Sequence, residues 1–374
     1  MTAMAVLLAC AGLLIYSYAL FPFLLALISR RVPETPTDPS EWPRVSVVLS
    51  VFNEEKHIAA RLANFVALDY PADRLEFLVG SDGSTDGTEV ILASCADKRL
   101  HFERMPSRGG KPRVLNYLVR QAKNELLVFT DANTMFATDA LKKLVRHFSD
   151  PMIGGVCGRL ILEGNSSETD ENAYWRLETF LKTRESRLDS CLGANGGIYA
   201  IRRRLWPGIP DNAFVDDFVI GMRVRESGSR VIYDAEAVAL EDMPEKVSAE
   251  FGRRVRIGAG GFQALVLCWR SLLPWRGAYT WAFWSHKVLR WFGPFFMLGA
   301  IIANVMMPWS GLSGTVLSLQ LLFYALAVAG ALRLGRNSLL SVPHYFVAMN
   351  YALLLGFFRF VTGRQRAAWQ RTIR

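Results

Sequence analysis

The chain has 374 residues, of which 51% are hydrophobic, and carries a formal net charge of +9. This composition argues against an ordinary soluble protein, because the apolar excess lies at the two ends of the chain around a charged middle. The basic residues alternate with tryptophans and apolar runs, which argues against a nucleic-acid-binding protein. The five cysteines lack the spacing of a zinc site and suggest a reducing compartment. The layout predicts a soluble domain held between membrane segments.

The N-terminus begins with one long apolar run, residues 4–28, which ends in a serine and two arginines at 29–31. The run is too long for the core of a signal peptide, and no basic residue precedes it. We therefore expect residues 1–29 to form a retained transmembrane helix whose C-terminal end lies in the cytoplasm. Residues 30–43 are rich in proline and polar side chains, which predicts a linker.

Strand and helix patterns alternate from residue 44 onward. Buried-strand patterns end in polar loops, and amphipathic helix patterns follow them. This alternation predicts an α/β domain with a doubly wound, Rossmann-like sheet, whose ligands gather at the carboxyl ends of parallel strands. The pattern loosens after Asp150, and we place the whole domain at residues 44–246. We expect strands at 44–53, 74–84, 100–105 and 125–134, and helices at 54–68, 84–96 and 111–122.

The rest of the chain is patterned for a membrane. Residues 247–286 combine tryptophans with arginines in amphipathic segments, which predicts interfacial helices in contact with membrane lipids. Three apolar stretches follow, at 288–308, 312–332 and 339–361. We expect residues 287–374 to hold two or three transmembrane spans and a basic tail.

At the C-terminus, the side of the membrane predicted from the basic residues conflicts with the side predicted from the number of spans. No acidic residue occurs from Phe251 onward, and such basic segments tend to face the cytoplasmic leaflet and its anionic lipids. If the last apolar stretch crosses the membrane fully, the arginines of the tail lie on the other side. Either that stretch is partly re-entrant or interfacial, as Pro343 and Asn350 would permit, or the positive-inside tendency fails here.

Polar side chains with the chemistry of a nucleotide site lie at three places in the predicted domain. Asn53 and Glu54 follow the first strand, and Asp82 follows the second in a turn of Gly and Ser. A carboxylate and loop amides at such strand ends can bind a base and a ribose. Lys111 follows two glycines at a helix start, where its ammonium could meet a diphosphate. Helix and turn capping is the alternative interpretation of these residues.

Two further segments carry acids. Asp131 ends a hydrophobic strand and Asn133 follows two residues later, so two oxygen atoms can serve a hard divalent cation together with phosphate oxygens. Asp216 and Asp217 lie between apolar runs at a helix start, where a carboxylate can take a proton from an attacking hydroxyl. Capping of the turn or helix is again the alternative.

Six segments follow one another in a recognisable order, namely VSVVLSVFNEE, SDGSTDGT, GGKPRVLN, TDANT, GANGGIYAIRR and VDDFVIGMRV. Together they resemble the family-2 inverting glycosyltransferases with the GT-A fold. The flanking apolar spans make the chain similar to the membrane branch that contains hyaluronan, chitin, cellulose and poly-N-acetylglucosamine synthases. The resemblance covers about residues 44–290.

The resemblance implies a role for each matching position. Asp217 would be the general base, with Asp216 as its acidic neighbour. Asp131 and Asn133 occupy the place of the Asp-x-Asp motif, which implies Mg²⁺ or Mn²⁺ as a cofactor. The nucleotide sugar would lie against Phe52, Asn53, Glu54, Asp82, Lys111 and Asp131, and the acceptor against Asn195, Gly196 and Gly197.

Two departures from the family pattern bear on function. Asn133 replaces the second acid of the metal motif, which lowers the charge of the ligand set. The processive synthases carry Gln-x-x-Arg-Trp where this chain has GRRVRIG. Arg253, Arg254 and Arg256 could still clamp a leaving diphosphate, but Ile257 stands in the place of the Trp that would stack on the acceptor.

The sequence thus predicts a glycosyltransferase of the bacterial inner membrane, with several spans and a cytoplasmic catalytic domain. Its expected partners are a nucleotide-sugar donor, which the resemblance implies is a UDP-sugar, and a saccharide or lipid-linked acceptor. A second copy or an export protein would complete a translocation path, and no nucleic acid is expected. Polysaccharide synthesis and the addition of one sugar to a lipid remain open. The alternative of another class is a membrane protein that binds sugar nucleotides without catalysis.

Overall fold

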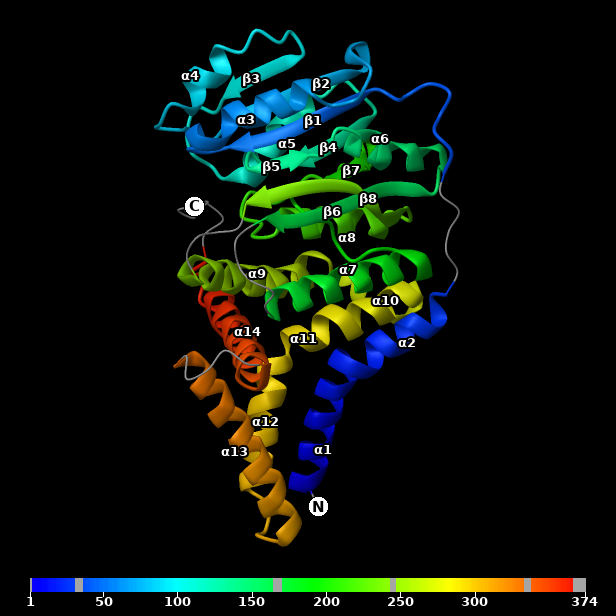
Figure 1. Cartoon of the computed structure of the whole chain (residues 1–374). Coiled ribbons are helices and arrows are strands. Elements are labelled where there is room, and N and C mark those ends of the chain that lie inside the picture. The colour runs from blue at the N-terminus through cyan, green and yellow to red at the C-terminus, as the bar shows by residue number, and fades with distance from the viewer. Residues whose placement is uncertain (1, 31–35, 164–169, 243–246, 333–337, 366–374) are drawn as a thin grey trace.

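The computed structural model describes residues 2–30, 36–163, 170–242, 247–332 and 338–365. An α/β sheet domain forms one end of the molecule, and a bundle of helices that tapers away from it forms the other (Figure 1). The N-terminal helix and the C-terminal helices, far apart in the sequence, lie together in this bundle.

One eight-stranded sheet has the order β3-β2-β1-β4-β7-β6-β8-β5. The first four strands in this order are parallel, as predicted, and β7 is antiparallel to both of its neighbours. The sheet is therefore mixed beyond β4, which differs from a wholly parallel doubly wound sheet. The strands are β1 Val45–Val51, β2 Leu75–Ser81, β3 Leu100–Arg104, β4 Leu126–Thr130, β5 Thr134–Phe136, β6 Ile153–Glu163, β7 Tyr199–Arg202 and β8 Arg230–Asp242.

Two apolar cores lie on the two faces of the sheet, because alternate residues of each strand point to opposite faces. Helices α3 (Glu55–Val66), α4 (Thr88–Ala93) and α6 (Ala140–Val145) cover one face. Helices α5 (Lys111–Gln121), α7 (Asp170–Leu188) and α8 (Asp216–Glu226) cover the other. Short 3₁₀ turns lie at Ala72–Arg74, Arg146–Ser149, Arg203–Leu205, Trp269–Leu272 and Pro274–Arg276.

The second core continues without a break into the helical bundle. Phe21, Phe262, Phe283 and Trp291 come from the bundle, yet they belong to the same buried cluster as the apolar residues of α5 and α8. The sheet domain and the bundle therefore share one hydrophobic interior, and burial of this surface holds them together.

The bundle contains three helices that are long and apolar enough to cross a membrane, Thr2–Ile28, Gly311–Ala331 and Leu339–Val361, among the described residues. A fourth candidate is the pair Ala278–Trp291 and Gly293–Val305, which is bent by 61°. This pair includes the apolar stretch predicted at 288–308. The helices are α1 Thr2–Ile15, α2 Phe21–Ile28, α9 Val247–Leu267, α10 Ala278–Ala282, α11 Leu289–Trp291, α12 Gly293–Val305, α13 Gly311–Ala331 and α14 Ser338–Val361, with π-helical segments η1 Tyr16–Leu20 and η7 Phe283–Val288.

Helix α14 packs against α9 through small residues. A Cβ added at Gly356 would lie 2.6 Å from the backbone nitrogen of Ala259, so the two backbones approach closely. The rings of Phe262 and Phe357 pack edge to face beside this contact, 5.1 Å apart. The C-terminal part of α14 lies beside α9, toward the sheet domain (Figure 1).

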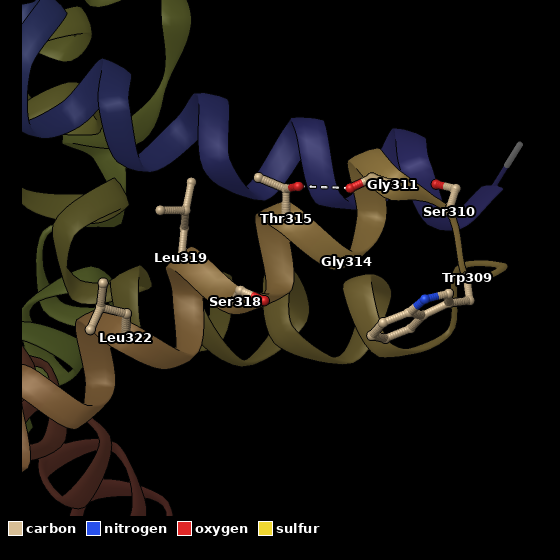
Figure 2. A pocket seen from close by; sticks show the side chains of 8 residues that line it. All are labelled: Trp309, Ser310, Gly311, Gly314, Thr315, Ser318, Leu319 and Leu322. Atoms are coloured by element: carbon tan, nitrogen blue, oxygen red, sulfur yellow. Dashed lines mark hydrogen bonds between the residues drawn. The ribbon is translucent and has the colours of Figure 1, made fainter.

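A pocket of about 440 Å³ lies at the start of α13 (Figure 2). The loop before α13 lies at the end of the bundle that is remote from the sheet (Figure 1). The pocket is therefore far from the carboxyl ends of the strands, where the candidate active site lies. Its lining residues are Trp309, Ser310, Gly311, Gly314, Thr315, Ser318, Leu319 and Leu322.

The close packing of β2 against α5 gives a test of the fold. A Cβ at Gly80 would overlap Val114 and lie 3.2 Å from Leu118 Cδ1. We expect Gly80→Ala to lower the free energy of unfolding by about 1–3 kcal/mol through overpacking, measured by thermal unfolding of the purified protein. Gly12→Ala is the control, because no atom lies within 4 Å of its added Cβ. Equal melting temperatures for the two variants would contradict the packing described.

Candidate active site

Three acids predicted from the sequence lie around one lysine. Asp131 follows the end of β4, Lys111 begins α5, and Asp216 and Asp217 begin α8. The ammonium Nζ of Lys111 lies 2.7 Å from Asp131 Oδ1 and 3.6 Å from Asp216 Oδ2. Segments about a hundred residues apart in the sequence thus meet at the carboxyl edge of the sheet.

Electrostatics couple these groups. Burial works against the charge of Lys111, but the carboxylates of Asp131 and Asp216 outweigh it and raise the pKa of the ammonium. Burial and the neighbouring charge of Asp216 raise the pKa of Asp217, while Lys111 acts in the opposite direction. A carboxyl group with a raised pKa is a better proton acceptor than an ordinary aspartate, provided that it is ionised.

Helix α9 holds the loop that precedes the acid pair. Gln263 Oε1 accepts a hydrogen bond from the backbone N–H of Phe214 at 2.9 Å, and Gln263 Nε2 donates to Asn212 O at 2.9 Å. Arg256 donates to Phe214 O at 3.2 Å. Burial and Arg253 lower the pKa of Arg256, and the carboxylates of the acid cluster oppose this shift. Of the arginines predicted to clamp a diphosphate, Arg256 therefore lies near the acids.

The loop of residues 192–197, hereafter the acceptor loop, approaches Asp217. A Cβ added at Gly196 would lie 3.0 Å from Asp217 Oδ2, so a larger residue there would press against this carboxylate. Asn195 Nδ2 donates to Gly158 O at 2.8 Å, and Lys182 donates to Asn195 Oδ1. The predicted acceptor residues and the predicted base are therefore adjacent.

The loops after β1 and β2 are joined by hydrogen bonds. Asn53 has a left-handed backbone with φ of 55°, and its side-chain Oδ1 accepts from Thr85 N at 2.7 Å. The backbone N–H of Glu54 donates to Thr88 Oγ1 at 2.8 Å. Part of the polar pattern at Asn53 and Glu54 thus joins the two loops, whereas the expected side-chain cap of α3 does not form at its N-cap residue Glu54. Contact with a nucleotide stays a prediction.

Asp82 holds the loop that contains Gly109 and Gly110, at the carboxyl edge of the sheet. Its two carboxylate oxygens accept from the backbone N–H groups of Gly109 at 2.7 Å and Gly110 at 2.8 Å. Gly110 has a φ of 91°, a conformation that favours glycine. Asp82 thereby fixes the loop that leads into Lys111, and its contact with a base stays a prediction.

The predicted metal motif contains one carboxylate and one amide. Asp131 is partly exposed, whereas Asn133 is buried and its Nδ2 donates to Glu241 Oε1 at 3.1 Å. Within the described ranges no three His, Cys, Asp or Glu side chains are grouped to hold a metal ion. A hard cation such as Mg²⁺ can take one or two protein oxygens and complete its shell with phosphate and water, so Asp131 and Asn133 as its ligands stay a prediction.

Several neighbours of the site are absent from the sequence-based prediction. Arg108 lies over the ring of Phe52, with its guanidinium carbon 3.8 Å from the ring centroid. Lys182 and Glu241 contact Asn195 and Asn133 from α7 and β8. Arg108 adjoins the glycine pair before Lys111, so that motif could have indicated it. No local pattern marks the other two, because their contacts depend on distant segments.

Part of this chain is similar to known proteins. Residues 46–206 match the family model described as glycosyl transferase family 2. An N-acetylglucosaminyltransferase of Rhizobium sp. (strain N33) is 24% identical over 252 residues, which cover 62% of this chain and 56% of that protein. A poly-beta-1,6-N-acetyl-D-glucosamine synthase of Staphylococcus aureus (strain COL) is 25% identical over 237 residues, which cover 60% and 56%. The matches thus span little more than half the length of these relatives.

A solved structure is similar over nearly the whole chain. The mannosyltransferase PcManGT from Pyrobaculum calidifontis, in complex with GDP-Man and Mn²⁺, superposes with a TM-score of 0.76 at 22% sequence identity. The similarity covers 97% of this chain and 99% of that one. At this level of identity the likeness concerns the fold, and it includes the helical bundle as well as the sheet.

The sheet domain has a mixed α/β, GT-A-like fold. Residues 46–206, a little under half of the chain, are similar to glycosyl transferase family 2 domains.

A metal titration tests the ligand set. We expect Asn133→Ala to raise the Mn²⁺ concentration needed for half-saturation in the presence of a nucleoside diphosphate, because one oxygen ligand is lost. Isothermal titration of Mn²⁺ into the protein measures this. Asn124→Ala is the control, since Asn124 lies at the opposite end of β4 and donates to Val45 O. An unchanged Mn²⁺ titration for Asn133→Ala would show that Asn133 is not a ligand.

Proposed function

We propose that the protein is a membrane-embedded inverting glycosyltransferase that transfers a sugar from a nucleoside-diphosphate sugar, a UDP-sugar by expectation, to a growing polysaccharide. The observation that carries the proposal is the approach of Gly196 in the acceptor loop to Asp217. Lys111 lies between Asp131 and Asp216, the neighbour of Asp217. In the proposal, Asp217 is the base, the acceptor loop binds the acceptor sugar, and the ammonium of Lys111 faces the diphosphate.

In the proposed reaction an acceptor hydroxyl lies between the acceptor loop and Asp217. The carboxylate of Asp217 takes the proton as the hydroxyl oxygen forms a bond to the anomeric carbon, and the bond from that carbon to the diphosphate breaks. Lys111 and the arginines of α9, among them Arg256, supply positive charge where the diphosphate leaves. A divalent cation held by Asp131 and Asn133 would add charge neutralisation for the same leaving group.

Membrane attachment is supported by the apolar helices of the bundle and by their shared core with the sheet domain. We propose that the sheet domain faces the cytoplasm of a bacterial cell, at the inner membrane. The Trp269 and Trp275 side chains, 54% and 76% exposed, suit a membrane interface, where an aromatic ring has one apolar side and one polar side.

Addition of a single sugar to a membrane lipid is the second candidate. Ile257 in α9 favours it, because an aliphatic side chain replaces the stacking Trp of the processive synthases. Labelled nucleotide sugars supplied to membranes that contain the protein, followed by sizing of the product, distinguish the two. A polymer supports the first candidate, and one lipid-linked sugar supports the second.

The role of Asp217 is tested by Asp217→Asn. We expect transfer to fall by roughly 10²–10⁴-fold while nucleotide affinity is kept, because the amide has nearly the same shape but cannot take up the proton. Asp211→Asn in the preceding exposed loop is the matched control and should transfer normally. Full activity of the Asp217→Asn enzyme would refute the assignment of the base.

A pH profile tests the electrostatics of the site. The raised pKa of Asp217 means that transfer should fail on acidification at a higher pH than for an ordinary aspartate, because the protonated carboxyl cannot act as a base. Lys111→Gln removes a charge that lowers this pKa, so the acidic limb should move to still higher pH. Lys142→Gln, which breaks the surface pair with Asp69, should leave the limb in place. Identical limbs for wild type and Lys111→Gln would contradict the coupling.

A further inference from the structure

One face of α7 carries three charged residues that connect the bundle to the acceptor loop. Glu178, Lys182 and Glu185 are spaced by four and three residues, so their side chains lie on the same side of the helix. Glu178 and Glu185 contact the bundle, and Lys182 contacts Asn195 of the acceptor loop.

His286 lies at the centre of the contacts with the bundle. The ring is fully buried in the π-helical segment Phe283–Val288. Its Nδ1 contacts the carboxylate of Glu185, and its Nε2 lies 3.0 Å from Glu178 Oε1. Each ring nitrogen therefore faces a carboxylate oxygen, so the imidazole joins Glu185 to Glu178.

The same network is tied to the N-terminal helix. Lys287 Nζ lies 2.9 Å from Glu178 Oε2, and Arg290 Nη1 lies 3.5 Å from Glu178 Oε1. Arg290 also donates to Ser17 O in the first membrane helix, at 3.3 and 3.4 Å. Glu178 is thus fixed by cations of the bundle.

Glu185 connects this network to the site. Its Oε2 accepts from the backbone N–H of Leu192 at 3.4 Å, at the first residue of the acceptor loop. Four residues further along the chain, Gly196 approaches Asp217. A continuous series of contacts therefore runs from His286 through Glu185 and the acceptor loop to the base.

We propose that His286 is a positioning residue for sugar transfer, which holds Glu185 so that the acceptor loop stays against Asp217. The proposal rests on the proposed function and extends it, because it assigns acceptor alignment to the membrane-side helices. His286 does not touch the reacting atoms; it acts through Glu185 and the loop.

The physical reason is the burial of Glu185. A buried carboxylate that loses a hydrogen-bond partner is left unsatisfied, so it turns toward other donors. This change weakens its hold on Leu192 N–H and releases the acceptor loop. The loops after β1 and β2 are held by hydrogen bonds of their own, among them those of Asn53 and Asp82, so donor binding should persist.

The test compares two reactions of the full-length enzyme, the hydrolysis of the donor by water and the transfer of its sugar to the acceptor. His286→Gln should raise the acceptor KM or lower transfer to acceptor by about 10- to 100-fold, with donor KM and donor hydrolysis by water within about twofold of wild type. Glu185→Gln should likewise impair transfer to the acceptor and leave the donor kinetics unchanged. This variant replaces His286→Gln in the test if His286→Gln does not fold. His147→Gln is the matched control, because His147 Nε2 pairs with Asp234 Oδ2 at 2.7 Å beside the other core of the sheet.

Three results would overturn the inference in different ways. Unchanged acceptor kinetics in both folded variants would show that the network does not position the loop. An equal loss of hydrolysis and of transfer, together with a lower melting temperature, would show that it serves stability alone. A wild-type enzyme that neither hydrolyses nor transfers from any nucleotide sugar would refute the proposed function itself, which is a distinct outcome.

Discussion

The ion pair between Lys111 and Asp131 is the constraint on which the candidate site depends. Three carboxylates gathered at one edge of the sheet repel one another, and at an effective dielectric of about 20 each close pair of like charges costs on the order of 4 kcal/mol. Lys111 lies between Asp131 and Asp216 and offsets part of this repulsion. The carboxylate of Asp82 binds the amides that precede Lys111, so the loop presents the ammonium in this position. A cluster of acids can thus exist in the folded chain before any substrate binds.

The second constraint is the shared core of the sheet domain and the helical bundle. The loop before Asp216 is held by Gln263 of α9, and α9 is itself held by α14 at Gly356. The site is therefore built partly from the membrane-side helices, and the sheet alone does not define it. A solved mannosyltransferase structure superposes over 97% of the chain, so this joint architecture of sheet and bundle recurs in another protein.

Local pattern predicted the first half of the domain well. The strands and helices from Val45 to Thr130 fall within their predicted ranges, because each is a single buried or amphipathic segment with a polar end. The antiparallel strand Tyr199–Arg202 was not predictable in its direction, since four residues carry no signal for the neighbour with which they pair. Likewise, the acids of the site follow strand or helix boundaries and could be found. His286, which meets Glu185 across 101 residues, has no local pattern that marks its contact.

The central claim is a single displacement in which Asp217 deprotonates the acceptor. Its most direct test is the anomeric configuration of the product, read by nuclear magnetic resonance after reaction with a donor whose sugar is α-linked to the diphosphate. A single displacement inverts the anomeric centre, so the account predicts a β-linked sugar in the product. An α-linked sugar would require two displacements or a different mechanism, and would contradict the role assigned to Asp217.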